Sequence, residues 1–166
     1  MKFCRTAALF VLCLLLCVCA RNARIDYSEL SLRLGETDPR FAFSEENLFR
    51  VDATWYVYYG FTREDDMLLT FKEDETGLLT GGTLALDGDC VSAADDFRAF
   101  SLALAAAFIP DADLVSLSAG TGLGGADLFS LRCETWPCGF YRASLFCSEG
   151  GPVFSLEYGE LYEKST

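Results

Sequence analysis

Residues 92–109 carry the one long helical pattern of the chain, and segments with strand patterns lie on both sides of it. Ser92 stands at the N-cap position and Pro110 follows the last turn, as expected at the two ends of a helix. Four apolar residues recur at helical spacing and so share one face: Phe97, Phe100, Leu104 and Phe108. The opposite side carries Ser101 and several alanines, so we expect it either to be covered as well or to expose a weak apolar patch.

Three strand patterns precede this helix and three follow it, and the connections between them are charged or rich in glycine. The strand patterns cover Trp55–Thr62, Met67–Lys72, Leu79–Leu86, Asp127–Cys133, Gly139–Cys147 and Val153–Tyr158. Strands grouped on either side of one helix favour an α+β fold over a parallel sheet. The sequence therefore predicts an antiparallel sheet of six to seven strands with one long helix packed on one face, in the order β-meander, helix, β-meander.

The domain organisation follows from where these patterns begin. We expect a signal peptide over residues 1–20, an N-terminal extension over residues 21–50 and a single α+β domain over residues 51–166. Within the extension, the alternation of Leu30, Leu32 and Leu34 predicts a short strand.

The N-terminus has the order of a secretory signal peptide. Two basic residues precede an unbroken apolar run of fourteen residues, Ala7–Ala20, and small residues at its end offer a cleavage site after Ala20. Two alternatives stay open: the segment is retained as a membrane anchor, or Cys17 or Cys19 is lipidated. The predicted location is secreted or at the cell surface, and contact with a membrane is expected only if the leader is retained or lipidated.

Charge and composition exclude several classes of function. The chain has a net charge of -12 and no histidine. An acidic surface repels phosphate backbones, so nucleic acid is not an expected partner. Catalytic triads, Cys–His pairs and His-ligated zinc all need imidazole, so they are excluded. No motif calls for a cofactor, and none is expected.

Four cysteines lie beyond the leader, at positions 90, 133, 138 and 147. An even number in an exported domain predicts two disulfides. We expect Cys133–Cys138 to close the turn Glu134–Cys138 and Cys90–Cys147 to tie the start of the helix to the sheet. Free thiols and a four-cysteine zinc site are the alternatives, and the second usually requires two close pairs.

The remaining motifs are explained by loops and turns, without a nucleotide, calcium or catalytic site. Gly120, Gly122 and Gly125 form a G-x-G-x-x-G pattern, but a strand pattern follows it, so we expect a flexible hairpin loop. Neither acidic cluster has the spacing of an EF-hand; the clusters are Asp87, Asp89, Asp95 and Asp96, and Asp111 with Asp113. Four further carboxylates fall in expected turns, where nothing shelters a catalytic acid: Asp65, Asp66, Glu73 and Glu75.

Aromatic residues concentrate on the first of the long strands. Because side chains alternate along a strand, Val57 and Tyr59 share the face expected under the helix, and Tyr56 and Tyr58 share the other. If that second face is exposed, Tyr56 and Tyr58 form a recognition surface for a protein or a carbohydrate. The alternative is that they pack across strands.

Three functions follow from these observations. The first is a non-catalytic module that binds a protein or a carbohydrate through Tyr56 and Tyr58. The second is a structural or assembly partner that docks through the alanine-rich helix, near Ala103, or through an open sheet edge. The third is a small hydrolase that uses two carboxylates, and it is the least supported by the motifs.

Overall fold

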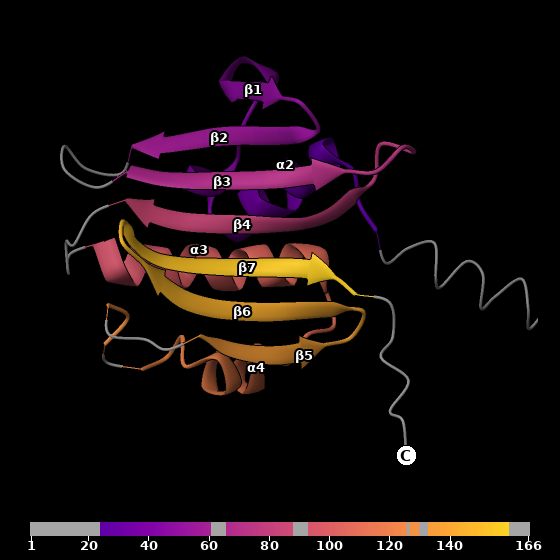
Figure 1. The fold of residues 1–166 in the computed structure, drawn as a ribbon. Coiled ribbons are helices and arrows are strands. Elements are labelled where there is room, and N and C mark those ends of the chain that lie inside the picture. The colour runs from indigo at the N-terminus through magenta and orange to yellow at the C-terminus, as the bar shows by residue number, and fades with distance from the viewer. Residues whose placement is uncertain (1–23, 61–65, 88–92, 126, 130–132, 160–166) are drawn as a thin grey trace, which may run out of the picture.

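The computed structural model describes residues 24–60, 66–87, 93–125, 127–129 and 133–159. Its elements are, in chain order, helix α2 (Tyr27–Thr37), the 3-10 turns η1 (Pro39–Phe41) and η2 (Glu45–Asn47), strands β1 (Leu48–Val51), β2 (Thr54–Gly60), β3 (Asp66–Glu73) and β4 (Leu79–Asp87), helices α3 (Ala94–Phe108) and α4 (Leu114–Thr121), and strands β5 (Glu134–Cys138), β6 (Tyr141–Ser148) and β7 (Gly151–Tyr158). Figure 1 shows how the strands follow one another across the molecule.

The strands form one sheet in the order β1-β2-β3-β4-β7-β6-β5, and every neighbouring pair is antiparallel. Strands β4 and β7 pair in the middle of the sheet, where Leu84 lies opposite Phe154. Both of these side chains are fully buried. The predicted α+β class is therefore confirmed, with an antiparallel sheet of seven strands.

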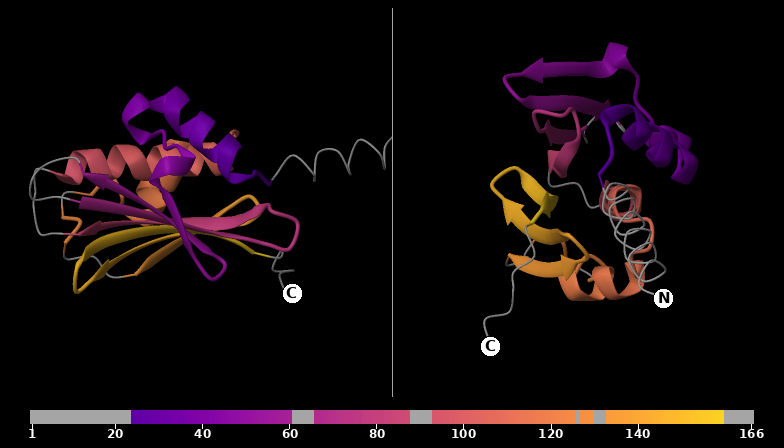
Figure 2. Two further views of the ribbon diagram at one scale, coloured as in Figure 1. Left: turned by 90° about the horizontal axis from the view of Figure 1, so that it is seen from above. Right: turned by 90° about the vertical axis from the view of Figure 1, so that its right-hand side faces the viewer.

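The helices α2, α3 and α4 all lie on one face of the sheet, and none of the described residues forms a helix on the other face (Figure 2). The predictions of a single long helix and of the order β-meander, helix, β-meander are not confirmed, because the described residues hold three α-helices of 11, 15 and 8 residues. We call the face without helices the outer face and the face under the helices the inner face.

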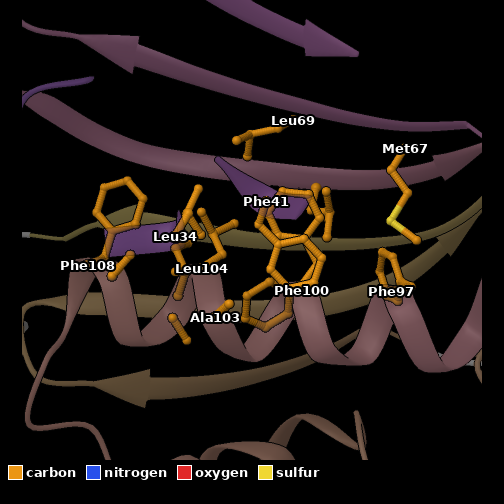
Figure 3. Packing of buried hydrophobic residues seen from close by; sticks show 14 of the residues in the cluster. Leu34, Phe41, Met67, Leu69, Phe97, Phe100, Ala103, Leu104 and Phe108 are labelled. Carbon is orange, nitrogen blue, oxygen red and sulfur yellow. The ribbon is translucent and has the colours of Figure 1, made fainter. Parts of the chain in front are cut away.

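Helix α3 lies against the inner face through the apolar stripe that its sequence predicts. Phe97, Phe100, Leu104 and Phe108 are buried, and the ring of Phe41 stacks on that of Phe100 at 4.2 Å (Figure 3). Burying one large apolar side chain contributes about 1.5–3 kcal/mol. Ser101 and Ala103, on the flanks of the stripe, are buried too. On the side opposite the stripe, Ala99 is exposed and Ala106 is half-buried, so this side of α3 is only partly covered.

Residues 27–37 form a helix, and the predicted strand over Leu30, Leu32 and Leu34 is wrong. The Asp26 side chain accepts a hydrogen bond from the backbone N–H of Glu29 and caps the helix. Leu30 and Leu34 are four residues apart and fully buried, whereas Leu32 points away and is 58% exposed. Burial of an i, i+4 pair together with a cap outweighs the alternating pattern.

The described part of residues 21–50 belongs to the same hydrophobic core as the strands. Leu30, Leu34 and Phe41 join the cluster formed by α3 and the inner face. Glu45–Asn47 forms the 3-10 turn η2, with Ser44 as its N-cap residue.

The segment between α4 and β6 also differs from the prediction. Residues 134–138, expected as a turn, form the edge strand β5, and Asp127–Phe129 is not a strand. A proline is tolerated at an edge strand, so Pro137 does not prevent pairing with β6. The glycines from 120 to 125 end helix α4, with Gly122 at its left-handed C-cap, and they do not form the predicted hairpin loop.

Candidate binding surface

Four apolar side chains gather at one end of the outer face. In the register of β1 and β2, Phe49 lies opposite Tyr56 and Val51 lies opposite Thr54. Side-chain alternation puts Tyr58 on the same face. We call Phe49, Val51, Tyr56 and Tyr58 the aromatic patch.

The rings of the aromatic patch lie nearly parallel to one another. The ring centroid of Phe49 is 5.2 Å from that of Tyr56 and 5.5 Å from that of Tyr58, with 11° between the planes in both pairs. Phe49, Val51 and Tyr58 are nevertheless 42%, 55% and 61% exposed. Large apolar side chains that stay exposed together are typical of an interaction surface.

The alternation of side chains along β2 determines on which face of the sheet each predicted residue lies. Val57 and Tyr59 are buried on the inner face, and the hydroxyl of Tyr59 donates to the carbonyl of Phe41 at 2.8 Å. Burial raises the pKa of Tyr59 above its ordinary value. Tyr56 and Tyr58 therefore share the outer face, as predicted. Phe49 was not predicted, because its place beside them depends on the pairing of β1.

The outer face beyond the aromatic patch carries two kinds of row. The row that starts at Tyr58 stays apolar across the sheet and continues with Leu68, Ala85, Val153 and Phe146. Directly opposite residues form a row of hydroxyl side chains across five strands: Thr70, Thr83, Ser155, Ser144 and Thr135. These hydroxyl side chains are much shorter than the aromatic rings of the patch. What distinguishes the aromatic patch is exposure: Phe49, Val51 and Tyr58 are exposed, whereas Leu68 and Phe146 are half-buried and Val153 is buried.

Three residues of the predicted acidic clusters form a cap or an ion pair, namely Asp95, Asp96 and Asp113. Asp113 caps α4, and a hydrogen bond from the hydroxyl of Ser116 lowers the pKa of the Asp113 carboxyl. Asp95 pairs with Arg98, and Asp96 pairs with Arg40.

Residues 65 and 89 lie outside the described residues, as does the side chain of residue 66. No group of three or more metal-ligating side chains occurs among the described residues.

One carboxylate that the sequence analysis did not single out organises the turn between β3 and β4. The Asp74 carboxylate accepts hydrogen bonds from the Thr76 hydroxyl at 2.6 Å and the Thr76 backbone N–H at 2.8 Å, and it pairs with Arg24. The Thr76 hydroxyl is the largest cause of the lowered pKa of Asp74. All of these partners are structural, so Asp74 is a turn residue.

The cysteines that the structure describes are free thiols, namely Cys133, Cys138 and Cys147. The structure therefore does not support the predicted disulfide between Cys133 and Cys138. Strand β5 holds the two residues apart, because five extended residues span about 16 Å and a disulfide needs Cα atoms about 4.4–6.8 Å apart. Cys90 lies outside the described residues, so the Cys90–Cys147 disulfide stays a prediction.

The half-buried thiol of Cys138 is also poorly suited to catalysis. Burial raises its pKa and so disfavours the thiolate, which is the reactive form.

The leader falls outside the described residues, and its cleavage, retention or lipidation stays a prediction. Within the described part of the chain, no helix has the length and apolar character needed to cross a membrane.

The aromatic patch is the described surface with the clearest binding character, and its assignment rests on geometry alone. Comparisons of the chain with protein-family models, curated proteins and solved structures found no match.

Proposed function

We propose that the protein is an exported, non-catalytic binding module whose partner contacts the aromatic patch. The observation that carries the proposal is the near-parallel stacking of Phe49 on Tyr56 and Tyr58 while Tyr58 stays 61% exposed. Rings that are held in place by their neighbours lose little conformational freedom when a partner binds. Export is inferred from the leader pattern over residues 1–20.

A protein is the favoured partner. The aromatic patch continues onto the aliphatic Val51 at the end of strand β1, and β1 is an edge strand of the sheet. An edge strand offers backbone groups that an extended segment of another protein pairs with. Carbohydrate, the other ligand predicted from Tyr56 and Tyr58, needs stacking rings but gains little from an aliphatic side chain beside them.

The alternative of docking through the alanine-rich helix has little support. Ala103 is 2% exposed and Ala105 is fully buried, so neither side chain is available to a partner. The alternative of a hydrolase is equally poorly supported, because Asp74 is a turn residue, Asp95 and Asp96 form ion pairs, and Asp113 caps a helix. Docking through an open sheet edge is retained, since β1 borders the aromatic patch.

Photo-crosslinking of the exported protein in its native cells tests the proposal. A photoreactive residue replaces Val51 in the patch or, as the matched control, Val115 on α4, which is also exposed. We expect one discrete crosslinked protein from position 51, no such species from position 115, and its loss when Tyr58→Ser is added.

A second assay distinguishes the two ligand classes. The unmodified protein and the Tyr58→Ser variant are applied to a glycan array. A glycan signal that Tyr58→Ser removes, without a protein crosslink at position 51, contradicts the protein partner and assigns a carbohydrate to the patch. The absence of both signals contradicts the binding function itself.

A further inference from the structure

A groove separate from the aromatic patch lies between α2 and residues 42–48, which lead into β1. Its volume is about 600 Å³, within the range of protein sites that hold ligands. Six residues give it its character, namely Tyr27, Leu32, Glu36, Phe43, Glu45 and Leu48. Leu48 lies opposite the buried Val57, so the groove is on the inner side of β1. We call it the α2 groove.

The α2 groove is preformed by contacts between its two walls. The hydroxyl of Ser31 donates to the carbonyl of Phe43 and accepts from the backbone N–H of Phe43 at 2.9 Å. Gly35 brings the helix close to Ala42, whose Cβ would lie 2.9 Å from a Cβ added at position 35. A site fixed in this way loses little entropy when it is filled.

One wall exposes an apolar side chain that the fold does not require. Leu32 is 58% exposed and lies in the groove, whereas Leu30 and Leu34 hold α2 to the core. On the opposite wall the half-buried Leu48 adds apolar surface, and Phe43, which is 8% exposed, adds a small part of its side chain. A ligand of the groove therefore needs apolar groups of its own.

The charge of the α2 groove is negative. Glu36 on α2 and Glu45 on η2 line it, and no lysine or arginine does so among the residues that the structure describes. The nearby arginines have other partners, since Arg33 pairs with Glu29 and Arg40 pairs with Asp38 and Asp96. The hydroxyl of Tyr27 donates to Glu45 at 2.8 Å, and this bond is the largest cause of the raised pKa of Tyr27. The field at the groove therefore favours cations.

We propose that the α2 groove binds a short, basic, amphipathic segment of a partner protein. Apolar side chains of that segment contact Leu32 and Leu48, and its lysine or arginine residues lie beside Glu36 and Glu45. Two carboxylates on different elements, with an apolar wall between them, match a chain that carries several basic residues better than an amphiphile with one charged head.

Fluorescence anisotropy with a labelled twelve-residue peptide tests the proposal. The probe carries leucines at helical spacing and lysines elsewhere, and its counterpart carries glutamates in place of the lysines. We expect the lysine peptide to bind at least tenfold more tightly than the glutamate peptide, and more weakly as salt is raised.

Matched variants separate the groove from the general acidity of the chain. Leu32→Ser should weaken the lysine peptide at least fivefold and Val115→Ser less than twofold, since both residues are exposed. Glu36→Gln should weaken it more than Glu149→Gln, which removes an exposed charge on a distant turn. Tyr58→Ser should leave peptide binding unchanged, which makes this test independent of the proposed function.

Three results would overturn the proposal. The first is equal peptide affinity for Leu32→Ser and Val115→Ser, which indicates non-specific attraction. The second is comparable binding of the glutamate peptide. The third is self-association of the protein that Leu32→Ser abolishes, which assigns the groove to a second copy of the chain.

Discussion

The ring of Phe49 on β1 lies 5.5 Å from the ring of Tyr58 on β2, with 11° between their planes. This contact joins the edge strand to its neighbour on the outer face, yet it leaves Tyr58 more than half exposed. The exposed area is what a partner would cover, and the stacked area is what holds the ring in position.

Replacing Tyr58 with serine should therefore cost little stability. A cross-strand side-chain pair contributes about 0.2–1 kcal/mol, so we expect Tyr58→Ser to lower the free energy of unfolding by about 1 kcal/mol or less. Urea denaturation measures this difference. A loss above about 2 kcal/mol would instead show that Tyr58 is a packing residue, because single substitutions of that size arise from buried contacts.

Helix α4 and strand β5 approach each other closely at Gly120. A Cβ added to Gly120 would lie 2.1 Å from Cε3 of Trp136. Alanine normally favours a helix over glycine by about 1 kcal/mol, but here overpacking should dominate and Gly120→Ala should destabilise by about 1–3 kcal/mol. Thermal denaturation measures the change, with Gly159→Ala, which meets nothing within 4 Å, as the control. A rise in stability would contradict the close packing of α4 on β5.

The hydroxyl of Ser101 is buried in α3 without a hydrogen-bond partner. Removing a buried polar group that lacks a partner removes its desolvation cost, so Ser101→Ala should stabilise by about 1 kcal/mol. Ser116→Ala provides the opposite case, because the Ser116 hydroxyl donates to Asp113 at 2.7 Å. Chemical denaturation of both variants should give changes of opposite sign, and a loss of stability in Ser101→Ala would show that its hydroxyl has a partner.

Alkaline pH should destabilise the fold through its buried tyrosines. Burial raises the pKa of Tyr141 to about 12, whereas a tyrosine in the unfolded chain titrates near 10. Below pH 10 both states keep the proton, and between pH 10 and 12 only the folded state does. Between pH 10 and 12, the ionisation of Tyr141 should therefore lower the free energy of unfolding by about 1.4 kcal/mol per pH unit.

The comparison of variants isolates this effect. Tyr141→Phe should show a smaller loss of stability between pH 9.5 and 11.5 than the unmodified protein, and Tyr58→Phe on the surface serves as the control. Equal slopes for the unmodified protein and Tyr141→Phe would contradict the burial of the Tyr141 hydroxyl.

The sequence predicts α3 and most strands well because their periodicity is set by local burial. The stripe from Phe97 to Phe108 and the alternation from Trp55 to Tyr59 each report a face that is apolar along its whole length. The same alternation places Tyr56 and Tyr58 on the outer face without any knowledge of the neighbouring strands.

Helix α2 is not predicted because Leu32, between Leu30 and Leu34, completes the alternating pattern that is typical of a strand. The apolar pair that determines its burial is Leu30 with Leu34, and the cap at Asp26 is a second helical signal. Leu32 belongs instead to the α2 groove, so the misleading residue is one that the fold leaves available for binding. Positions where local pattern and structure disagree are often functional ones.

Phe49 and the α2 groove could not be predicted because both depend on long-range pairing. Phe49 reaches Tyr58 only through the register of β1 on β2. The α2 groove depends on the hydrogen bonds between the Ser31 hydroxyl on α2 and the backbone of Phe43, which lies twelve residues further along the chain. The periodicity of apolar and polar residues along one segment carries no information about its contacts with a distant segment.

The affinity of the protein partner for two phenylalanine variants tests the central claim most directly. Phe49 in the aromatic patch and Phe140 beside β6 are 42% and 40% exposed, so Phe49→Ser and Phe140→Ser are matched in burial. The protein crosslinked at position 51 is purified, and its dissociation constant is measured for each variant after circular dichroism has shown that both fold. We predict at least tenfold weaker binding for Phe49→Ser, equivalent to about 1.4 kcal/mol, and less than a twofold change for Phe140→Ser. Equal affinities for the two variants would contradict binding through the aromatic patch.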